Sequence, residues 1–124
     1  MVEIEVANRS GAQLDLDAAG DLIRAVLRDE GIEEGELGLQ LVGPGEIRGL
    51  KRDHLGVDEE TDALAFPIDG REPVPTGIPR QLGDVVLCPQ VVGDAWRAPL
   101  VHAVLHLLDY DHGLEMEARE RVHA

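Results

Sequence analysis

The hydrophobic and polar positions along the chain change period repeatedly, which predicts strands and helices in alternation. Residues 2–6 alternate apolar and acidic side chains, as a half-buried strand does. Between residues 17 and 29, apolar side chains recur at the three- and four-residue spacing of a helix with one buried face. Asp15 or Asp17 can cap this helix. Residues 37–42 return to strand character, and a turn is expected at residues 43–45.

The second half of the chain continues the alternation. A short polar helix is expected at residues 46–54, and two strands are expected at residues 63–66 and 84–88. A buried helix is expected at residues 100–108 and a solvated helix at residues 115–123. Residues 69–81 hold several glycines and prolines, which predicts a loop. This order predicts an α+β fold in a single domain of residues 1–124, with helices packed on a mixed four-stranded sheet.

Composition narrows the functional classes. With 124 residues and 44% hydrophobic side chains, the chain can bury a core without disulfides. Only 2% of the residues are aromatic, so an extended base-stacking platform is not expected. The net charge of −14 argues against generic binding to nucleic acid through counterion release. A site directed at RNA would therefore need a local positive charge, such as a metal ion.

The same composition indicates the compartment. Cys88 is the single cysteine, which excludes an internal disulfide and fits a reducing compartment. The sequence has no apolar run near 18 residues and no charged-then-apolar leader. We therefore expect a cytoplasmic protein that does not associate with membranes.

Three histidines carry the candidate chemistry. His102 and His106 are four residues apart, so on a helix they lie on one face and can both bind one metal ion. His112 comes ten residues after His102 and can join them only if the chain turns in between. Three imidazoles leave a fourth position for water, which is typical of catalytic zinc. Chance would produce these offsets in roughly one such chain per hundred.

Other residues near the histidines refine this hypothesis. Asp111 is expected to accept a hydrogen bond from a ligand imidazole, because metal-binding histidines usually donate their second N–H to a carboxylate or carbonyl. Ala103 stands where the glutamate of a metalloprotease HExxH motif would be, which disfavours a peptidase. His54 and His123 are expected to be solvated, and Cys88 to be a core thiol.

Three strings in the chain together resemble one family. VHAVLHLLDYDH, with LGDVVLCP upstream and TDALAFP before that, resembles the YbeY family of metal-dependent endoribonucleases. The resemblance covers roughly residues 50–117. It implies one zinc ion per chain, bound by His102, His106 and His112. It also implies cleavage of single-stranded RNA in maturation of the small-subunit rRNA 3′ end and in ribosome quality control, with the small subunit and assembly factors as partners.

The chain departs from the family pattern at several positions. Many members carry an arginine, thought to touch substrate phosphate, where this chain has Leu55. Arg52, one helical turn earlier, could bind substrate instead, or be a solvated surface arginine. Ala65 replaces a serine of the strand motif, and Asp109 replaces a glycine. Residues 89–99 are fewer than the expected helical segment requires, so a helix there is expected to be missing or reduced to a turn.

These observations lead to one prediction with two alternatives. The chain is expected to be a zinc-dependent, single-strand-specific endoribonuclease whose zinc site lies on a C-terminal helix and the turn that follows it. The first alternative is a zincin-like metallopeptidase, which the histidine spacing allows and Ala103 disfavours. The second is a non-catalytic ribosome assembly factor with a structural metal, suggested by Leu55 and the short chain.

Overall fold

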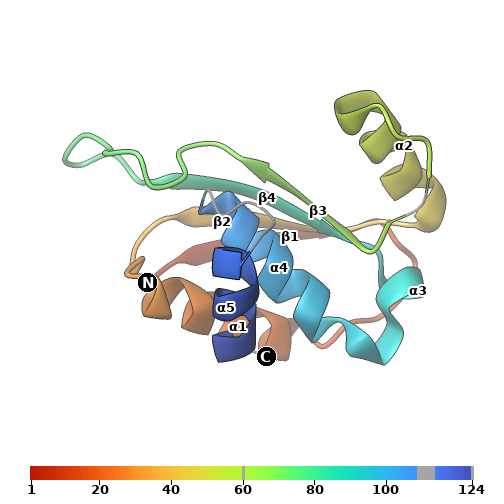
Figure 1. Cartoon of the computed structure of the whole chain (residues 1–124), viewed down its shortest axis with the longest axis horizontal. Coiled ribbons are helices and arrows are strands. Elements are labelled where there is room, and N and C mark those ends of the chain that lie inside the picture. The colour runs from red at the N-terminus through yellow and green to blue at the C-terminus, as the bar shows by residue number, and fades with distance from the viewer. Residues whose placement is uncertain (60, 109–113, 124) are drawn as a thin grey trace.

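The computed structural model describes residues 1–59, 61–108 and 114–123 and has the expected α+β architecture (Figure 1). Its elements are β1 (Glu3–Asn8), α1 (Leu16–Asp29), β2 (Glu36–Leu41), α2 (Pro44–Leu55), β3 (Ala63–Pro67), β4 (Gln81–Leu87), α3 (Pro89–Val92), a 3-10 turn (Gly93–Ala95), α4 (Arg97–Leu107) and α5 (Leu114–His123). None of the described helices is long and apolar enough to cross a membrane.

The sheet is mixed and places β3 at one edge. Its strand order is β1-β2-β4-β3. β1 pairs with β2 and β2 with β4 in parallel, whereas β3 pairs with β4 antiparallel. The predicted mixed four-stranded sheet is confirmed. Because β3 pairs with β4 on one side only, its other side forms an edge beside which further groups can lie.

Two aliphatic cores lie on opposite faces of the sheet. Helices α1, α4 and α5 gather on one face, and α2 lies over one end of the other (Figure 1). The larger core joins the sheet to α1 and α4, and the smaller core lies beneath α2. Ile23 of α1 and Leu105 of α4 are fully buried in the larger core, and Ile47 of α2 is fully buried in the smaller one. The only described cysteine, Cys88, is buried in the smaller core, as expected.

Local signals explain where the helices begin and end. Asp15 caps α1, because its side chain accepts a hydrogen bond of 3.0 Å from the Ala18 backbone N–H. Pro44 starts α2 immediately after Gly43, so this Gly-Pro pair begins a helix rather than forming the separate turn we expected. α2 ends at Leu55 and is capped by Gly56, whose left-handed conformation (φ +74°) favours glycine.

The segment between β4 and α4 is reduced, as the sequence suggested. α3 has only 4 residues, and a 3-10 turn of 3 residues follows it. α4 begins at Arg97, three residues earlier than the predicted start, because Pro99 is accommodated in the first helical turn. Trp96 beside this start is buried, and Arg97 lies 4.3 Å over its ring. The short connection therefore still fixes the start of the helix that carries His102 and His106.

Candidate metal centre and cleft

α4 brings His102 and His106 together as the four-residue spacing predicts. Their Nε2 atoms lie 3.0 Å apart, and their ring centroids are 4.6 Å apart with the planes at 73°. Two nitrogens bound to one tetrahedral zinc ion at about 2.0–2.1 Å would be roughly 3.3 Å apart. The imidazole pair therefore fits two ligands of a single ion with little adjustment.

The rest of α4 holds this pair in place. Val104, Leu105 and Leu108 are essentially fully buried against the sheet and α1, as expected for the apolar face of the helix. His102 and His106 are partly exposed on the opposite side. The helix ends at Leu107, one residue after the second histidine, and the turn that we expected beyond it lies outside the described residues.

The third expected ligand lies outside the described residues. His112, Asp111 and Asp109 all belong to residues 109–113, which the structure does not describe. Within the part of the chain that it does describe, no three histidine, cysteine, aspartate or glutamate side chains gather as metal ligands. The three-histidine set and the role of Asp111 thus stay predictions.

A carboxylate that the sequence analysis did not single out contacts the imidazole pair. The side chain of Glu120, on α5, has Oε2 at 3.2 Å from Nδ1 of His102, and each of the two side chains is 31% exposed. This is the kind of contact we expected from Asp111, but it comes from another helix. Sequence spacing could not reveal it, because the contact depends on how α5 packs against α4.

A cleft of about 800 Å³ opens beside the two histidines. It extends from α4 across the edge of β3 to the end of α2. Its lining residues are Lys51, His54, Leu55, Thr61, Asp62, Ala63, Leu64, Ala65, Phe66, Pro67, His102, Ala103 and His106. The candidate metal ligands therefore form one wall of a groove rather than an isolated surface pair.

The edge of β3 supplies backbone groups to this cleft. The Cys88 N–H donates to the Asp62 carbonyl at 3.0 Å, and the Ile68 N–H donates to the Leu82 carbonyl at 3.3 Å. Because backbone hydrogen bonding alternates along an antiparallel strand, the even-numbered residues of β3 form the hydrogen bonds with β4. Ala65 lies between them, so its N–H and C=O point away from β4, at the strand edge that lines the cleft.

Aromatic rings line the far wall of the cleft. Phe66 projects from β3 towards α2 and packs against the smaller core. His54 of α2 is exposed and meets the Phe66 ring edge-on, with centroids 4.9 Å apart. The sequence suggested no role for Phe66, although the proline that follows it is typical of edge strands and was a usable signal. The cleft thus has a small aromatic surface despite the low aromatic content of the chain.

Leu55 and Lys51 lie at the α2 end of the cleft. Leu55 is 60% exposed, so the position where the family resemblance leads us to expect arginine does face this groove. Lys51 brings a cation, and its Nζ lies 2.8 Å from the Glu59 carboxylate. Arg52 is not among the cleft-lining residues and contacts Asp53 at 3.2 Å. A substrate contact by Arg52 stays a prediction.

Ion pairs on the outer side of α2 hold the chain that follows it. Arg48 donates a hydrogen bond of 2.7 Å to Asp58. This hydrogen bond, with the nearby charges of Arg48 and Arg52, lowers the pKa of the Asp58 carboxyl. The contact restrains the segment between α2 and β3, which leads into the cleft.

The expectation that His123 is solvated is wrong. Its side chain is only 4% exposed and lies 3.5 Å from the carboxylate of Glu30, which is 5% exposed. Arg119 and Arg71 also contact this carboxylate, at 2.6 and 3.0 Å. The polar sequence of α5 gave no signal for this contact, because the contact forms only where α5 packs against the end of α1. His54, by contrast, is exposed as expected.

Comparisons with known proteins agree with the sequence resemblance. The family described as Endoribonuclease YbeY matches residues 5–123. The Endoribonuclease YbeY of Salinispora tropica is 37% identical over 96% of this chain and 88% of its own length. That of Acidothermus cellulolyticus is 38% identical over 94% and 83%, respectively. Both relatives therefore match almost the whole of this chain.

The fold also matches a solved structure. The solution structure of TM1509 from Thermotoga maritima aligns with a TM-score of 0.60 over 99% of this chain and 86% of that one. The two sequences are 24% identical. This likeness supports the α+β fold alone.

Proposed function

Since the chain belongs to the Endoribonuclease YbeY family, we propose that it is a zinc-dependent endoribonuclease that cleaves single-stranded RNA. We further propose that it acts in the cytoplasm on the 3′ end of small-subunit rRNA and in ribosome quality control, with the small subunit and its assembly factors as partners. The observation that carries the proposal is the approach of the two Nε2 atoms of His102 and His106 to 3.0 Å, in the wall of the cleft.

His102 and His106 would hold the ion, together with His112 from the residues that follow α4. The chemistry of these donors suits zinc, since neutral imidazole nitrogens are common zinc ligands. When bound, the ion polarises a phosphoryl oxygen and activates water as a nucleophile near neutral pH. Its charge also offsets the acidity of the chain where RNA phosphate would lie.

The other side of the cleft suits an unpaired strand. A base outside a duplex can lie against the rings of Phe66 and His54, whereas a base in a duplex is already stacked on its neighbours. The backbone N–H of Ala65 is oriented to donate a hydrogen bond to a phosphate or a base. Lys51 adds a cation at the same end. Substrate would therefore cross the edge of β3 to reach the imidazole pair.

The metallopeptidase alternative lacks its general base. Ala103, at the position of the HExxH glutamate, is 2% exposed and has no group that could accept a proton. Glu120 lies 3.2 Å from Nδ1 of His102, on the side of the ring away from the Nε2 atoms that would bind the ion. Peptide hydrolysis would thus need a base that the described residues around the imidazole pair do not supply.

The assembly-factor alternative requires an ion that holds the fold together. The two cores are aliphatic, and the larger one continues through α1, α4 and the sheet without any ligand from the histidines. A fold of this kind is expected to survive without the ion, unlike a zinc finger. The histidine pair faces a cleft rather than a closed interior, which favours a catalytic over a structural ion.

One experiment separates these functions. Cleavage of a single-stranded RNA, of the same RNA annealed to its complement, and of an unstructured protein should be measured with and without a chelator. The proposal predicts cleavage of the unpaired RNA only, with loss on chelation and recovery when zinc is restored. His106→Ala should be inactive at all zinc concentrations that support the native chain. Cleavage of the protein substrate would favour the peptidase, and unfolding on chelation would favour the structural ion.

A further inference from the structure

We propose that Glu120 is a positioning residue that fixes the orientation and tautomer of His102, and that an ionic cluster around the buried carboxylate of Glu30 holds α5 so that Glu120 can do so. This inference rests on the proposed metal-dependent function, because it assigns how one ligand of the ion is prepared. It concerns residues on α1 and α5, outside the histidine motif.

The contact itself determines which nitrogen of His102 is available. Oε2 of Glu120 lies 3.2 Å from Nδ1 of His102, so the carboxylate favours the tautomer whose proton is on Nδ1. Nε2 then keeps its lone pair, and this is the atom that lies 3.0 Å from Nε2 of His106. A carboxylate behind a ligand imidazole also increases the basicity of the coordinating nitrogen. Glu120 therefore directs a lone pair to the place where the ion would bind.

α5 is held by the residue next to Glu120. Arg119 donates a hydrogen bond of 2.6 Å from Nε to the carboxylate of Glu30, at the C-terminal end of α1. Arg71, from the loop between β3 and β4, donates to the same carboxylate at 3.0 Å. His123, one helical turn beyond Arg119, lies 3.5 Å from it. Glu30, Arg71, Arg119 and His123 thus form a cluster, here called the Glu30 cluster.

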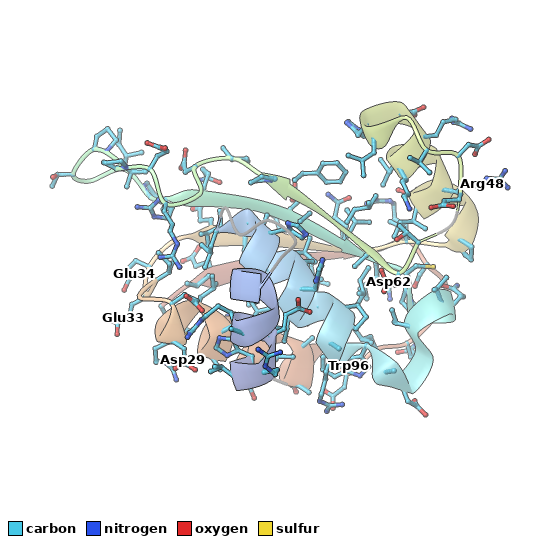
Figure 2. The ribbon with its side chains drawn as sticks, viewed as in Figure 1. Asp29, Glu33, Glu34, Arg48, Asp62 and Trp96 are labelled. Carbon is cyan, nitrogen blue, oxygen red and sulfur yellow. The ribbon has the colours of Figure 1, made fainter. Side chains whose placement is uncertain are left out.

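Burial of the Glu30 carboxylate restricts how far α5 can move relative to α1. The side chains of Glu30 and His123 are 5% and 4% exposed. A buried carboxylate is costly unless its partners stay within hydrogen-bonding distance, so α5 has little freedom to move away from α1. Adjacent residues of α5 make the two contacts. Arg119 binds Glu30 and so holds the helix, and Glu120 contacts the candidate metal ligand His102. Figure 2 shows α5 beside α4 and next to the end of α1 that carries Asp29.

The first test is zinc affinity, measured by competition with a chromogenic chelator. Glu120→Ala should weaken zinc binding by about 10–100-fold, which is the usual effect of removing such a partner. Glu120→Gln should cause a smaller loss, because the amide oxygen can still accept a hydrogen bond from Nδ1 of His102 but the charge is gone. Glu33→Gln is the control, since it removes one charge from an exposed glutamate elsewhere on the surface and should leave zinc affinity unchanged.

The second test needs no metal. In ¹⁵N NMR spectra of the imidazoles in the metal-free protein, His102 should carry its proton on Nδ1 in the native chain. In Glu120→Ala it should shift towards the Nε2-protonated form, while His54 stays unchanged. A residue that merely stabilises α5 would not alter this tautomer. Glu30→Gln should weaken zinc binding as well and lower the melting temperature, whereas Glu120→Gln should leave the melting temperature unchanged.

The outcomes are distinguishable. Unchanged zinc affinity in both Glu120 variants, or an unchanged His102 tautomer in Glu120→Ala, would overturn the role of Glu120 and leave the proposed function intact. Unchanged zinc affinity in Glu30→Gln would overturn the role of the Glu30 cluster. A native chain that binds no zinc would overturn the proposed function and this inference together.

Discussion

Replacing Leu55 with arginine is the most informative change to the cleft. Leu55 is 60% exposed at the last position of α2 and lines the same groove as His102 and His106. Because so little of its side chain is buried, Leu55→Arg should change the free energy of unfolding by no more than about 0.5 kcal/mol. Any effect on RNA cleavage can then be attributed to the new charge rather than to damage to the fold.

The size of the effect follows from the position. An exposed ion pair contributes about 0.2–1 kcal/mol, so one new contact with phosphate should lower KM for RNA by up to about fivefold. The same contact should steepen the dependence of log affinity on log salt by about 0.7 for a single strand. Between 50 and 200 mM salt, this adds roughly 2.6-fold to the loss of affinity.

The assay measures cleavage of a labelled single-stranded RNA at several salt concentrations. Val57→Arg is the matched control: Val57 is 41% exposed and two residues away, but it does not line the cleft. The reasoning predicts a lower KM and a steeper salt dependence for Leu55→Arg only. Equal effects in the two variants would show that the charge acts non-specifically, and no effect in either would show that substrate does not pass the end of α2.

Three further predictions test other parts of the molecule. Gly83→Ala should destabilise the fold by about 2–5 kcal/mol in urea unfolding, because Gly83 has a φ of +123° and an added Cβ would collide with the Phe66 carbonyl; a loss below about 0.5 kcal/mol would show that the β3–β4 pairing relaxes easily. Phe66→Leu keeps the apolar contact with the core but removes the ring, so it should raise KM for single-stranded RNA several-fold with little change in kcat; an unchanged KM would remove the ring from the substrate path. Arg48→Ala should raise the pKa of Asp58 towards its ordinary value in a carboxyl NMR titration, because the hydrogen bond that favours the ionised form is lost. Since Asp58 has a lowered pKa in the fold, its contribution to stability is present above the ordinary carboxyl pKa and disappears as the pH falls through the lowered value. Arg48→Ala should weaken that dependence, with the charge of Arg52 still lowering the pKa slightly.

The sequence predicted most of the fold because its elements carry local signals. The apolar spacing of residues 17–29 and the alternation of residues 2–6 appear in the structure as α1 and β1, with no end shifted by more than two residues. Pro44 misled the prediction of a turn, since a proline after glycine is common both in turns and at helix starts. The shift of α4 to Arg97 has the same cause, because a proline in the first turn of a helix does not interrupt it.

Half of the candidate site could be predicted from the sequence. A four-residue spacing fixes two side chains on one helical face, so the approach of His102 and His106 follows from their spacing alone. The contact of Glu120 with His102 could not be predicted, because it depends on how α5 packs. That packing involves the Glu30 cluster, whose residues also come from the end of α1 and from the β3–β4 loop. The expectation for His123 failed for the same reason: a polar helix shows no apolar stripe, although it buries an ionic contact.

The most direct test of the account is the zinc content of the purified native chain and of His106→Ala, with circular dichroism on the same samples. The proposed function predicts one zinc ion per native chain and less than about a tenth of that in His106→Ala. The two circular dichroism spectra should be the same, because the aliphatic cores do not depend on the ion. Full zinc occupancy in a folded His106→Ala would contradict the assignment of the metal centre to the imidazole pair of α4.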